Sequence, residues 1–364
     1  MTARPPATGF RSDRLPEHPV LALDVGGTKL AAGVVTTDGD LLSQLVAPSQ
    51  AEQGPDLMIS RLLELGREAV VAADVAWDDV AAVGIACGGP LDPIAGIIQS
   101  PPNLPGWDDV PLVPTVAAAL ERPTAVDNDA TAAALAEWWF GAGRRRATRQ
   151  LIYLTISTGV GGGLILDGQV YRGAAGNAGE LGHLTVDYRG RQCGCGRRGC
   201  LEAYASGTNI AARAREALAT GESSTLADLP AVTAKDVAQA AAAGDPLAAR
   251  IWDETTAILG SAIANILDIF NPELVVLGGG VTRAGDQLLV PVRDAGLAQA
   301  MAPARSSAEI VLAELGDRVG LVAAASVAFD RFGLMPAEDS QDDDRALERD
   351  GQTRETAGEE TPVG

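Results

Sequence analysis

Residues Leu21–Val35 read LALDVGGTKLAAGVV, and residues Leu151–Leu166, about 130 positions further along the chain, read LIYLTISTGVGGGLIL. These two stretches decide the fold class, because each has an apolar β-rich run, a glycine-rich turn with a threonine, and a second β-rich run. Hairpins of this kind are common, so coincidence is one interpretation. Duplication of a nucleotide-binding half is the other, and the two stretches alone leave both open.

Apolar β-rich runs alternate with amphipathic helical stretches through the rest of the chain. The pattern predicts strands at Val20–Val25, Leu30–Thr36, Val80–Ala86, Pro123–Asp127, Leu151–Ser157, Gly163–Asp167, Leu274–Leu277 and Glu309–Leu315. It predicts helices at Asp56–Ala73, Ala130–Phe140, Asn209–Ala219, Ala234–Ala243, Pro246–Phe270 and Gly285–Ala302. Such alternation is typical of an α/β fold.

The composition is that of a globular protein long enough for two domains, with 364 residues of which 46% are hydrophobic. The net charge of -20 argues against general nucleic-acid binding. No apolar run reaches about 18 residues and no export signal is visible, so we expect a cytoplasmic protein without a membrane partner. Residues 1–19 are expected to be a flexible leader, and the acidic residues 336–364 a disordered tail.

Three glycine clusters follow predicted strands. They are DVGGTK at Asp24–Lys29, TGVGGG at Thr158–Gly163 and the triplet Gly278–Gly280. Adjacent glycines let backbone N–H groups approach an anion closely, so such turns suit phosphate groups. The spacing of the first turn matches neither the P-loop nor the Rossmann pattern, and that turn alone is equally well structural. Together, the three clusters favour a nucleotide clamped between two lobes.

The motif Asp127-Asn128-Asp129 follows a predicted strand and precedes a predicted helix. The simpler interpretation, which the motif alone favours, is that Asp129 or a neighbour caps the helix. The alternative is a carboxylate that binds a ligand at the carboxyl end of a strand, with Asn128 gripping a hydroxyl. Asn103, in the proline-stiffened loop SPPNLPGW, is undecided between a sugar contact and a structural corner.

His183, Cys193, Cys195 and Cys200 form the pattern H-x9-C-x-C-x4-C. Three thiolates and an imidazole are a ligand set for a tetrahedral structural zinc ion. Unrelated thiols are the less favoured interpretation, since three of the chain's 4 cysteines are clustered, and a reducing cytosol disfavours disulfides. The fourth, Cys87, is interpreted as a small core residue.

Glu180 and Glu202 bracket the cysteine segment. Each alone could be a solvated side chain. A loop tied down by a metal would instead hold both carboxylates rigidly enough to accept hydrogen bonds from sugar hydroxyls. Their position on either side of the predicted metal site favours this second interpretation.

Together these residues resemble the ROK family of repressors, open reading frames and sugar kinases, and in particular its bacterial glucokinases. The matching segments are Asp24–Lys29, Asn103–Trp107, Asp127–Asp129, Gly176–His183 and Cys193–Glu202, within a resemblance that runs from about Leu21 to Phe332. The resemblance implies an actin-like (ribonuclease H-like), duplicated α/β ATPase fold with two lobes around a cleft. Residues 20–122 and 317–332 would form the small lobe, and residues 123–316 the large lobe with the zinc loop.

The resemblance also implies roles for individual residues. Asp129 would be the catalytic base, oriented toward a sugar hydroxyl that is a poor nucleophile by itself. The sugar would contact Gly89, Asn103, Asn128, Asp129, Glu180, His183 and Glu202. ATP would contact Asp24, Gly26, Gly27, Thr28, Lys29, Thr158, Gly159, Gly161, Gly278, Gly279 and Gly280. Mg²⁺ would bridge the phosphates near Asp24, and Zn²⁺ would bind His183, Cys193, Cys195 and Cys200 in a structural role.

The predicted function is therefore ATP-dependent phosphorylation of glucose at its 6-hydroxyl, in a homodimer or homotetramer. One alternative is a kinase for another hexose or N-acetylhexosamine, namely GlcNAc, ManNAc, mannose or fructose. A non-catalytic sugar sensor is disfavoured by Asp129 and by the short stretch before the first glycine turn. Glycoside hydrolysis by Glu180 and Glu202 would leave the glycine turns unexplained. The sequence does not decide between ATP and polyphosphate as the donor.

Overall fold

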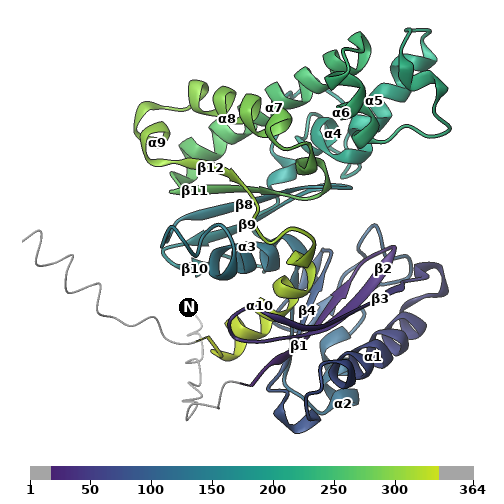
Figure 1. Ribbon diagram of the computed structural model, residues 1–364, viewed down its shortest axis with the longest axis vertical. Coiled ribbons are helices and arrows are strands. Elements are labelled where there is room, and N and C mark those ends of the chain that lie inside the picture. The colour runs from purple at the N-terminus through teal and green to yellow at the C-terminus, as the bar shows by residue number, and fades with distance from the viewer. Residues whose placement is uncertain (1–17, 336–364) are drawn as a thin grey trace, which may run out of the picture.

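The structure is a computed structural model in which residues 18–335 are described. The predicted tail, and all but the last two residues of the predicted leader, lie outside this range. No helix within it combines the length and the apolar character needed to span a bilayer. The described chain folds into two halves, each built on a five-stranded sheet (Figure 1).

The two sheets share one strand order and one set of strand directions. The first has the order β3 (Leu41–Pro48), β2 (Lys29–Val35), β1 (Val20–Val25), β4 (Val83–Cys87), β7 (Thr124–Asn128). The second has the order β10 (Gln169–Val170), β9 (Val160–Leu166), β8 (Leu151–Ile156), β11 (Leu274–Gly278), β12 (Glu309–Leu312). Each contains a three-stranded antiparallel meander followed by two strands in parallel. The two similar sequence stretches form the equivalent hairpins β1–β2 and β8–β9, so their likeness reflects duplication.

Helices cover the outer faces of both sheets. The first sheet carries α1 (Pro55–Ala72) and α2 (Leu112–Leu120), beside a small hairpin of β5 (Leu91–Asp92) and β6 (Ile97–Ile98). The second half has an outer layer of α4 (Glu202–Ala205), α5 (Gly207–Ala219), α6 (Ala234–Ala242), α7 (Pro246–Phe270), α8 (Asp286–Gln299) and α9 (Ala302–Ser307) (Figure 1). Each half therefore buries an apolar core of its own between its sheet and its helices.

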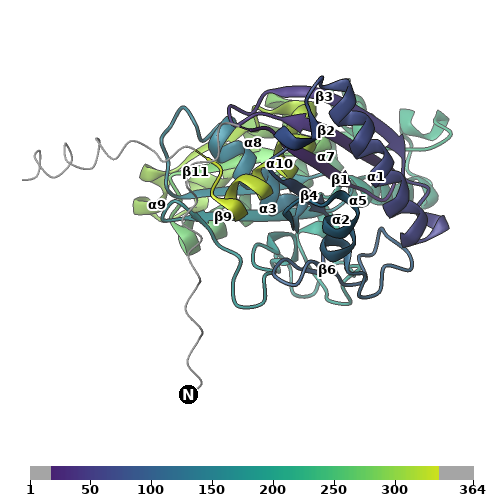
Figure 2. The ribbon, with the colours of Figure 1, turned by 90° about the horizontal axis from the view of Figure 1, so that it is seen from below.

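Two further helices, α3 (Asp129–Phe140) and α10 (Val319–Phe332), lie between the sheets, and Figure 2 shows them side by side from a second direction. α3 packs on β8 and β9, α10 packs on β1, β2 and β4, and the two helices pack on each other. Many of the side chains at this contact are alanines. Gly84 of β4 lets α10 come so close that a Cβ there would lie 1.9 Å from the Ala324 carbonyl oxygen. This third apolar core joins the halves.

Some element boundaries differ from those predicted. The strand predicted from residue 80 begins at Val83, because residues 77–79 form a short 3-10 turn. The helix predicted to residue 302 ends at Gln299, and α9 follows it. The large lobe was predicted to begin at residue 123, but β7 pairs with β4 in the first sheet, so the strands of the first half extend to Asn128.

Candidate active site

The halves meet around a cavity of about 590 Å³ at the ends of β1, β4, β8, β11 and β12. Its lining includes part of each of the three glycine clusters, together with the carboxylate of Asp129. From the predicted donor site it takes Asp24, Gly26, Thr28, Lys29, Thr158, Gly278, Gly279 and Gly280. The fold thus brings together turns that are far apart in sequence.

Gly279 illustrates why glycine is required in these turns. Its φ is 90°, which residues with a side chain rarely adopt, and a Cβ there would lie 2.5 Å from the Ile156 carbonyl oxygen. The third turn is therefore fixed by the path of β11 against β8.

Three other predicted donor glycines, Gly27, Gly159 and Gly161, do not line this cavity. A Cβ on Gly27 would lie 2.5 Å from the carbonyl oxygen of Asn103, and a Cβ on Gly159 would lie 2.6 Å from Oε2 of Glu202. Gly161 packs against α3. Protein neighbours alone therefore leave no room for a side chain at these positions, and donor contacts of these glycines stay a prediction.

The Asp127-Asn128-Asp129 motif divides into three different environments. The Asn128 side chain caps α3 by accepting hydrogen bonds from the backbone N–H groups of Ala130, at 2.9 Å, and Thr131, at 3.4 Å. Asp127 is buried and accepts a 2.7 Å hydrogen bond from Arg172. Only Asp129 lines the cavity. The capping interpretation is confirmed for Asn128, whereas ligand binding by Asp129 stays a prediction that its position in the cavity allows.

The carboxyl groups of Asp24 and Asp129, which both line the cavity, have raised pKa values. The pKa of Asp24 is raised to about 6, chiefly by desolvation and then by the charge of Asp129, while Lys29 opposes the rise. The side chain of Asp129 is exposed to the cavity, and desolvation by the cavity walls raises its pKa, although a hydrogen bond from the Ala130 N–H opposes this. A carboxylate with a raised pKa is a better proton acceptor near neutral pH.

The four predicted zinc ligands come together in the loop between β10 and α4. One possible ligand atom from each of His183, Cys193, Cys195 and Cys200 lies within 4.8 Å of the other three. Nδ1 of His183 is 3.8 Å from Sγ of Cys193, and Sγ of Cys195 is 3.7 Å from Sγ of Cys200. Nitrogen and sulfur atoms converging in this way fit a tetrahedral zinc ion.

His183 connects this cluster to the predicted sugar site. While its Nδ1 faces the thiols, its Nε2 lies 3.8 Å from Oε2 of Glu180. Glu180 is exposed, and its pKa is raised by desolvation, lowered by His183, and raised by the nearby charges of Asp129 and Glu202. Glu202 accepts a 3.0 Å hydrogen bond from the Val160 N–H, which ties the cysteine loop to the second glycine turn.

The remaining predicted sugar residues lie in the first half. A Cβ on Gly89 would lie 3.1 Å from Nδ2 of Asn128, so these two residues are neighbours. The backbone of Asn103 packs against Gly27 in the first glycine turn. The predicted sugar loop and the first glycine turn are therefore in direct contact, which the sequence did not indicate.

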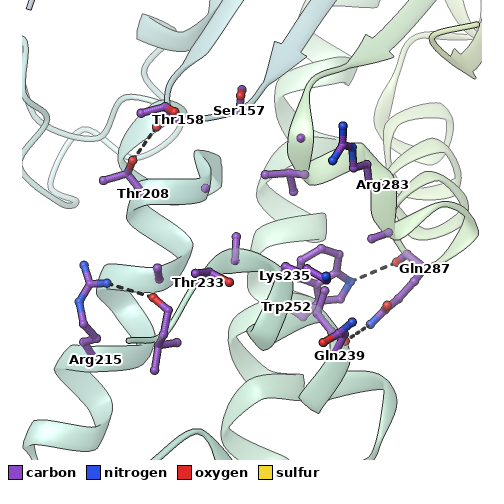
Figure 3. Close-up of a pocket in the computed structure, with 18 residues that line it drawn as sticks. Ser157, Thr158, Thr208, Arg215, Thr233, Lys235, Gln239, Trp252, Arg283 and Gln287 are labelled. Atoms are coloured by element: carbon purple, nitrogen blue, oxygen red, sulfur yellow. Dashed lines mark hydrogen bonds between the residues drawn. The ribbon is translucent and has the colours of Figure 1, made fainter. Parts of the chain in front are cut away.

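A second cavity, of about 770 Å³, opens beside the first in the second half (Figure 3). Helices α5, α6, α7 and α8 and the 3-10 turn at residues 280–284 supply its walls, with Thr208, Arg215, Thr233, Lys235, Gln239, Trp252 and Gln287 among the lining residues. None of these was predicted as a site residue. They are dispersed over elements between residues 207 and 287 and form no local motif, so a single sequence carried no signal for them.

Comparison with known proteins defines the class. Residues 20–331 match the ROK family. The glucokinase of Thermotoga maritima is 35% identical over 88% of this chain and 100% of its own. The N-acetylmannosamine kinase of Citrobacter koseri is 38% identical over 72% of this chain and 83% of its own. The structure of a ROK family glucokinase from Streptomyces griseus, in complex with glucose and AMPPNP, has a TM-score of 0.72 and 32% identity, covering 86% of this chain and 100% of that one.

The duplicated, two-lobed architecture is the actin-like ATPase fold of ROK kinases, as predicted. This chain belongs to the ROK family.

Proposed function

We propose that this protein is an ATP-dependent glucokinase, with Asp129 as the general base. The observation that carries the proposal is the position of Asp129, which lines the same cavity as residues from all three glycine turns. The likeness to ROK glucokinases over the length of the chain supports glucose as the acceptor. The two halves, the first of which includes β7, would act as lobes whose closure excludes water as a competing acceptor.

In the proposed reaction, Asp129 takes the proton of the glucose 6-hydroxyl as its oxygen attacks the γ-phosphorus of ATP. The bond between that phosphorus and the β–γ bridging oxygen breaks, and ADP leaves with the electron pair. Asn128, fixed as the cap of α3, holds Asp129 at the start of the helix. Glu180, His183, Glu202, Asn103 and Gly89 would position the sugar.

The donor would lie across both cavities. We assign the nucleoside to the cavity of about 770 Å³, and the terminal phosphates to the one of about 590 Å³ beside Asp129. N–H groups of the glycine turns and Lys29 would face the phosphate oxygens. A polyphosphate chain would use only the cavity of about 590 Å³ beside Asp129.

Two metal ions fit the residues present. Asp24 lines the cavity that would hold the terminal phosphates and is the expected ligand of Mg²⁺, which when bound neutralises phosphate charge. The thiols and His183 suit Zn²⁺, which would fix the loop that carries Glu180 and Glu202. We further propose a cytoplasmic homodimer or homotetramer, in keeping with the family.

The Asp129→Asn variant tests the base assignment. It keeps the shape of the side chain but cannot take a proton, so kcat for glucose should fall by a factor of about 10² to 10⁴. Glucose affinity, measured by calorimetry, and zinc content should change little. An Asp129→Asn enzyme with more than a tenth of the normal kcat would refute the assignment.

Phosphorylation of N-acetylmannosamine is the second candidate, because the kinase from Citrobacter koseri is 38% identical over its matched part. A coupled ADP-release assay over glucose, mannose, fructose, N-acetylglucosamine and N-acetylmannosamine separates the two. If kcat/KM for glucose is lower than kcat/KM for either N-acetylhexosamine, that N-acetylhexosamine is the preferred substrate instead of glucose.

A further inference from the structure

The two cavities share four residues, Ser157, Thr158, Gly280 and Arg283. Any molecule that extends from one cavity into the other must pass this junction. Figure 3 shows Ser157 and Arg283 on the same side of the hollow, at the ends of neighbouring elements. Ser157 and Thr158 follow β8, and Arg283 lies on the 3-10 turn that follows the third glycine cluster.

Arg283 is the one positively charged side chain, among the described residues, that lines both cavities. Lys29 lines only the smaller cavity, and Arg215 and Lys235 line only the larger. Arg215 is also engaged, because it donates a hydrogen bond to the Val232 carbonyl oxygen. A phosphate chain at the junction would therefore meet Arg283 before any other cation.

Arg283 already has a negatively charged partner. Its Nη2 pairs with Oδ1 of Asp317, on the 3-10 turn at residues 316–318 that leads into α10. Both side chains are largely exposed, at 75% and 88%. Exposed pairs contribute little net stability, whereas a guanidinium binds phosphate oxygens with two parallel hydrogen bonds. A bound phosphate chain would therefore displace Asp317.

We propose that Arg283 binds the phosphate chain of the donor at this junction, and that Asp317 competes with the phosphates for it. The proposal rests on the donor placement in the proposed function, and it concerns residues that the glycine-turn motifs do not include. Before the donor binds, Asp317 would hold the arginine beside the junction, and donor binding would release the segment that leads into α10.

The competition predicts opposite effects for the two partners. Arg283→Gln should weaken ADP binding, measured by titration calorimetry, about tenfold and should leave adenosine binding unchanged. Asp317→Asn should strengthen ADP binding about two- to fivefold, because the competing carboxylate is gone. Arg318→Gln is the matched control, since this neighbouring exposed arginine lines neither cavity and should have no effect.

The double variant distinguishes competition from simple repulsion by Asp317. Under competition, Asp317→Asn has no further effect once Arg283 is Gln. If Asp317→Asn strengthens ADP binding equally in both backgrounds, repulsion alone explains it and the competition is refuted. If Asp317→Asn weakens ADP binding, Asp317 is a donor or metal contact, and the proposal is also wrong. These binding titrations need no turnover. A failure to phosphorylate glucose would therefore refute the proposed function but would not decide whether Arg283 binds the phosphate chain.

Discussion

Arg172 joins the two halves through an ion pair that buries one partner completely. It donates from Nε to Oδ2 of Asp127 and from Nη2 to Oδ2 of Asp330, both at 2.7 Å. The Asp127 side chain is 1% exposed, and its other oxygen accepts from the Asn128 N–H at 2.8 Å. Replacing Arg172 with Met keeps most of the apolar stem and leaves Asp127 buried without a counter-charge.

The expected cost of Arg172→Met is about 3 kcal/mol in the free energy of unfolding. Removing one member of a buried pair costs about 3 to 5 kcal/mol, and the lower end applies because Arg172 is itself 26% exposed. Urea unfolding at pH 7 measures this directly. Arg146→Met is the matched control, because its 2.8 Å partner Glu309 is 56% exposed and stays solvated when the arginine is removed, so the loss should be less than about 1 kcal/mol.

The loss of stability in Arg172→Met should depend on pH. Burial raises the pKa of Asp127, and Arg172 opposes that rise, so the variant should have a still higher pKa in the folded state. A carboxyl group with a raised folded pKa favours the protonated folded protein, and this advantage is lost as pH rises through that pKa. The deficit relative to wild type should therefore grow from pH 5 to pH 8.

A second substitution tests the cause. Asp127→Asn in the Arg172→Met background removes the unpaired charge and should restore part of the lost stability, with little remaining pH dependence. Three results would each refute the reasoning: a deficit no larger than that of Arg146→Met, a deficit constant with pH, or no recovery on adding Asp127→Asn.

Four further outcomes follow from the site. Gly27→Ala should raise KM for glucose more than KM for ATP in steady-state assays, because the new methyl group would displace Asn103; an equal rise would contradict this. Glu137→Gln should cost about 1 to 3 kcal/mol in urea unfolding, since this buried carboxylate accepts three backbone N–H groups; unchanged stability would count against it. Cys200→Ser should abolish stoichiometric zinc, measured by mass spectrometry, and raise KM for glucose; a zinc-free enzyme with normal KM would disprove the positioning role. Protonation of Asp24 should raise KM for MgATP below about pH 6, and a flat profile to pH 5 would exclude its part in donor binding.

The sequence predicted the duplicated fold because its signal is local. The strands β1, β2, β8 and β9 are short apolar runs around glycine turns. Most of their residues are buried, so apolar residues follow one another instead of alternating with polar ones. β3 was missed because its side chains alternate between half-buried and exposed, and Leu42 and Val46 lie on its exposed side. The helix α2 was missed because it is short and lies in a proline-bearing segment.

The candidate base and the candidate metal ligands could be singled out in the sequence because each group lies within one motif. His183 and the three cysteines occupy 18 consecutive positions, so their meeting needs only a local loop. The second cavity could not be predicted, because Thr208, Lys235 and Gln287 meet only when α5, α6 and α8 pack on α7. The partner of Asp127 was equally hidden, since Arg172 lies 45 residues away in a loop without a motif.

The helix α3 links the proposed chemistry to the joint between the halves. Asp129 begins it, and near its other end Glu137 accepts hydrogen bonds from the backbone N–H groups of Glu314 and Leu315, at 3.1 and 2.9 Å. Those residues lead from β12 toward α10, which packs on the opposite sheet. These hydrogen bonds join α3 to the segment that leads to α10, so the lobe closure proposed above would act on α10 and on the sheet that carries Asp24 through this joint. Since the charge of Asp129 raises the pKa of Asp24, a cation that binds at Asp24 together with the donor would offset the repulsion between the two carboxylates.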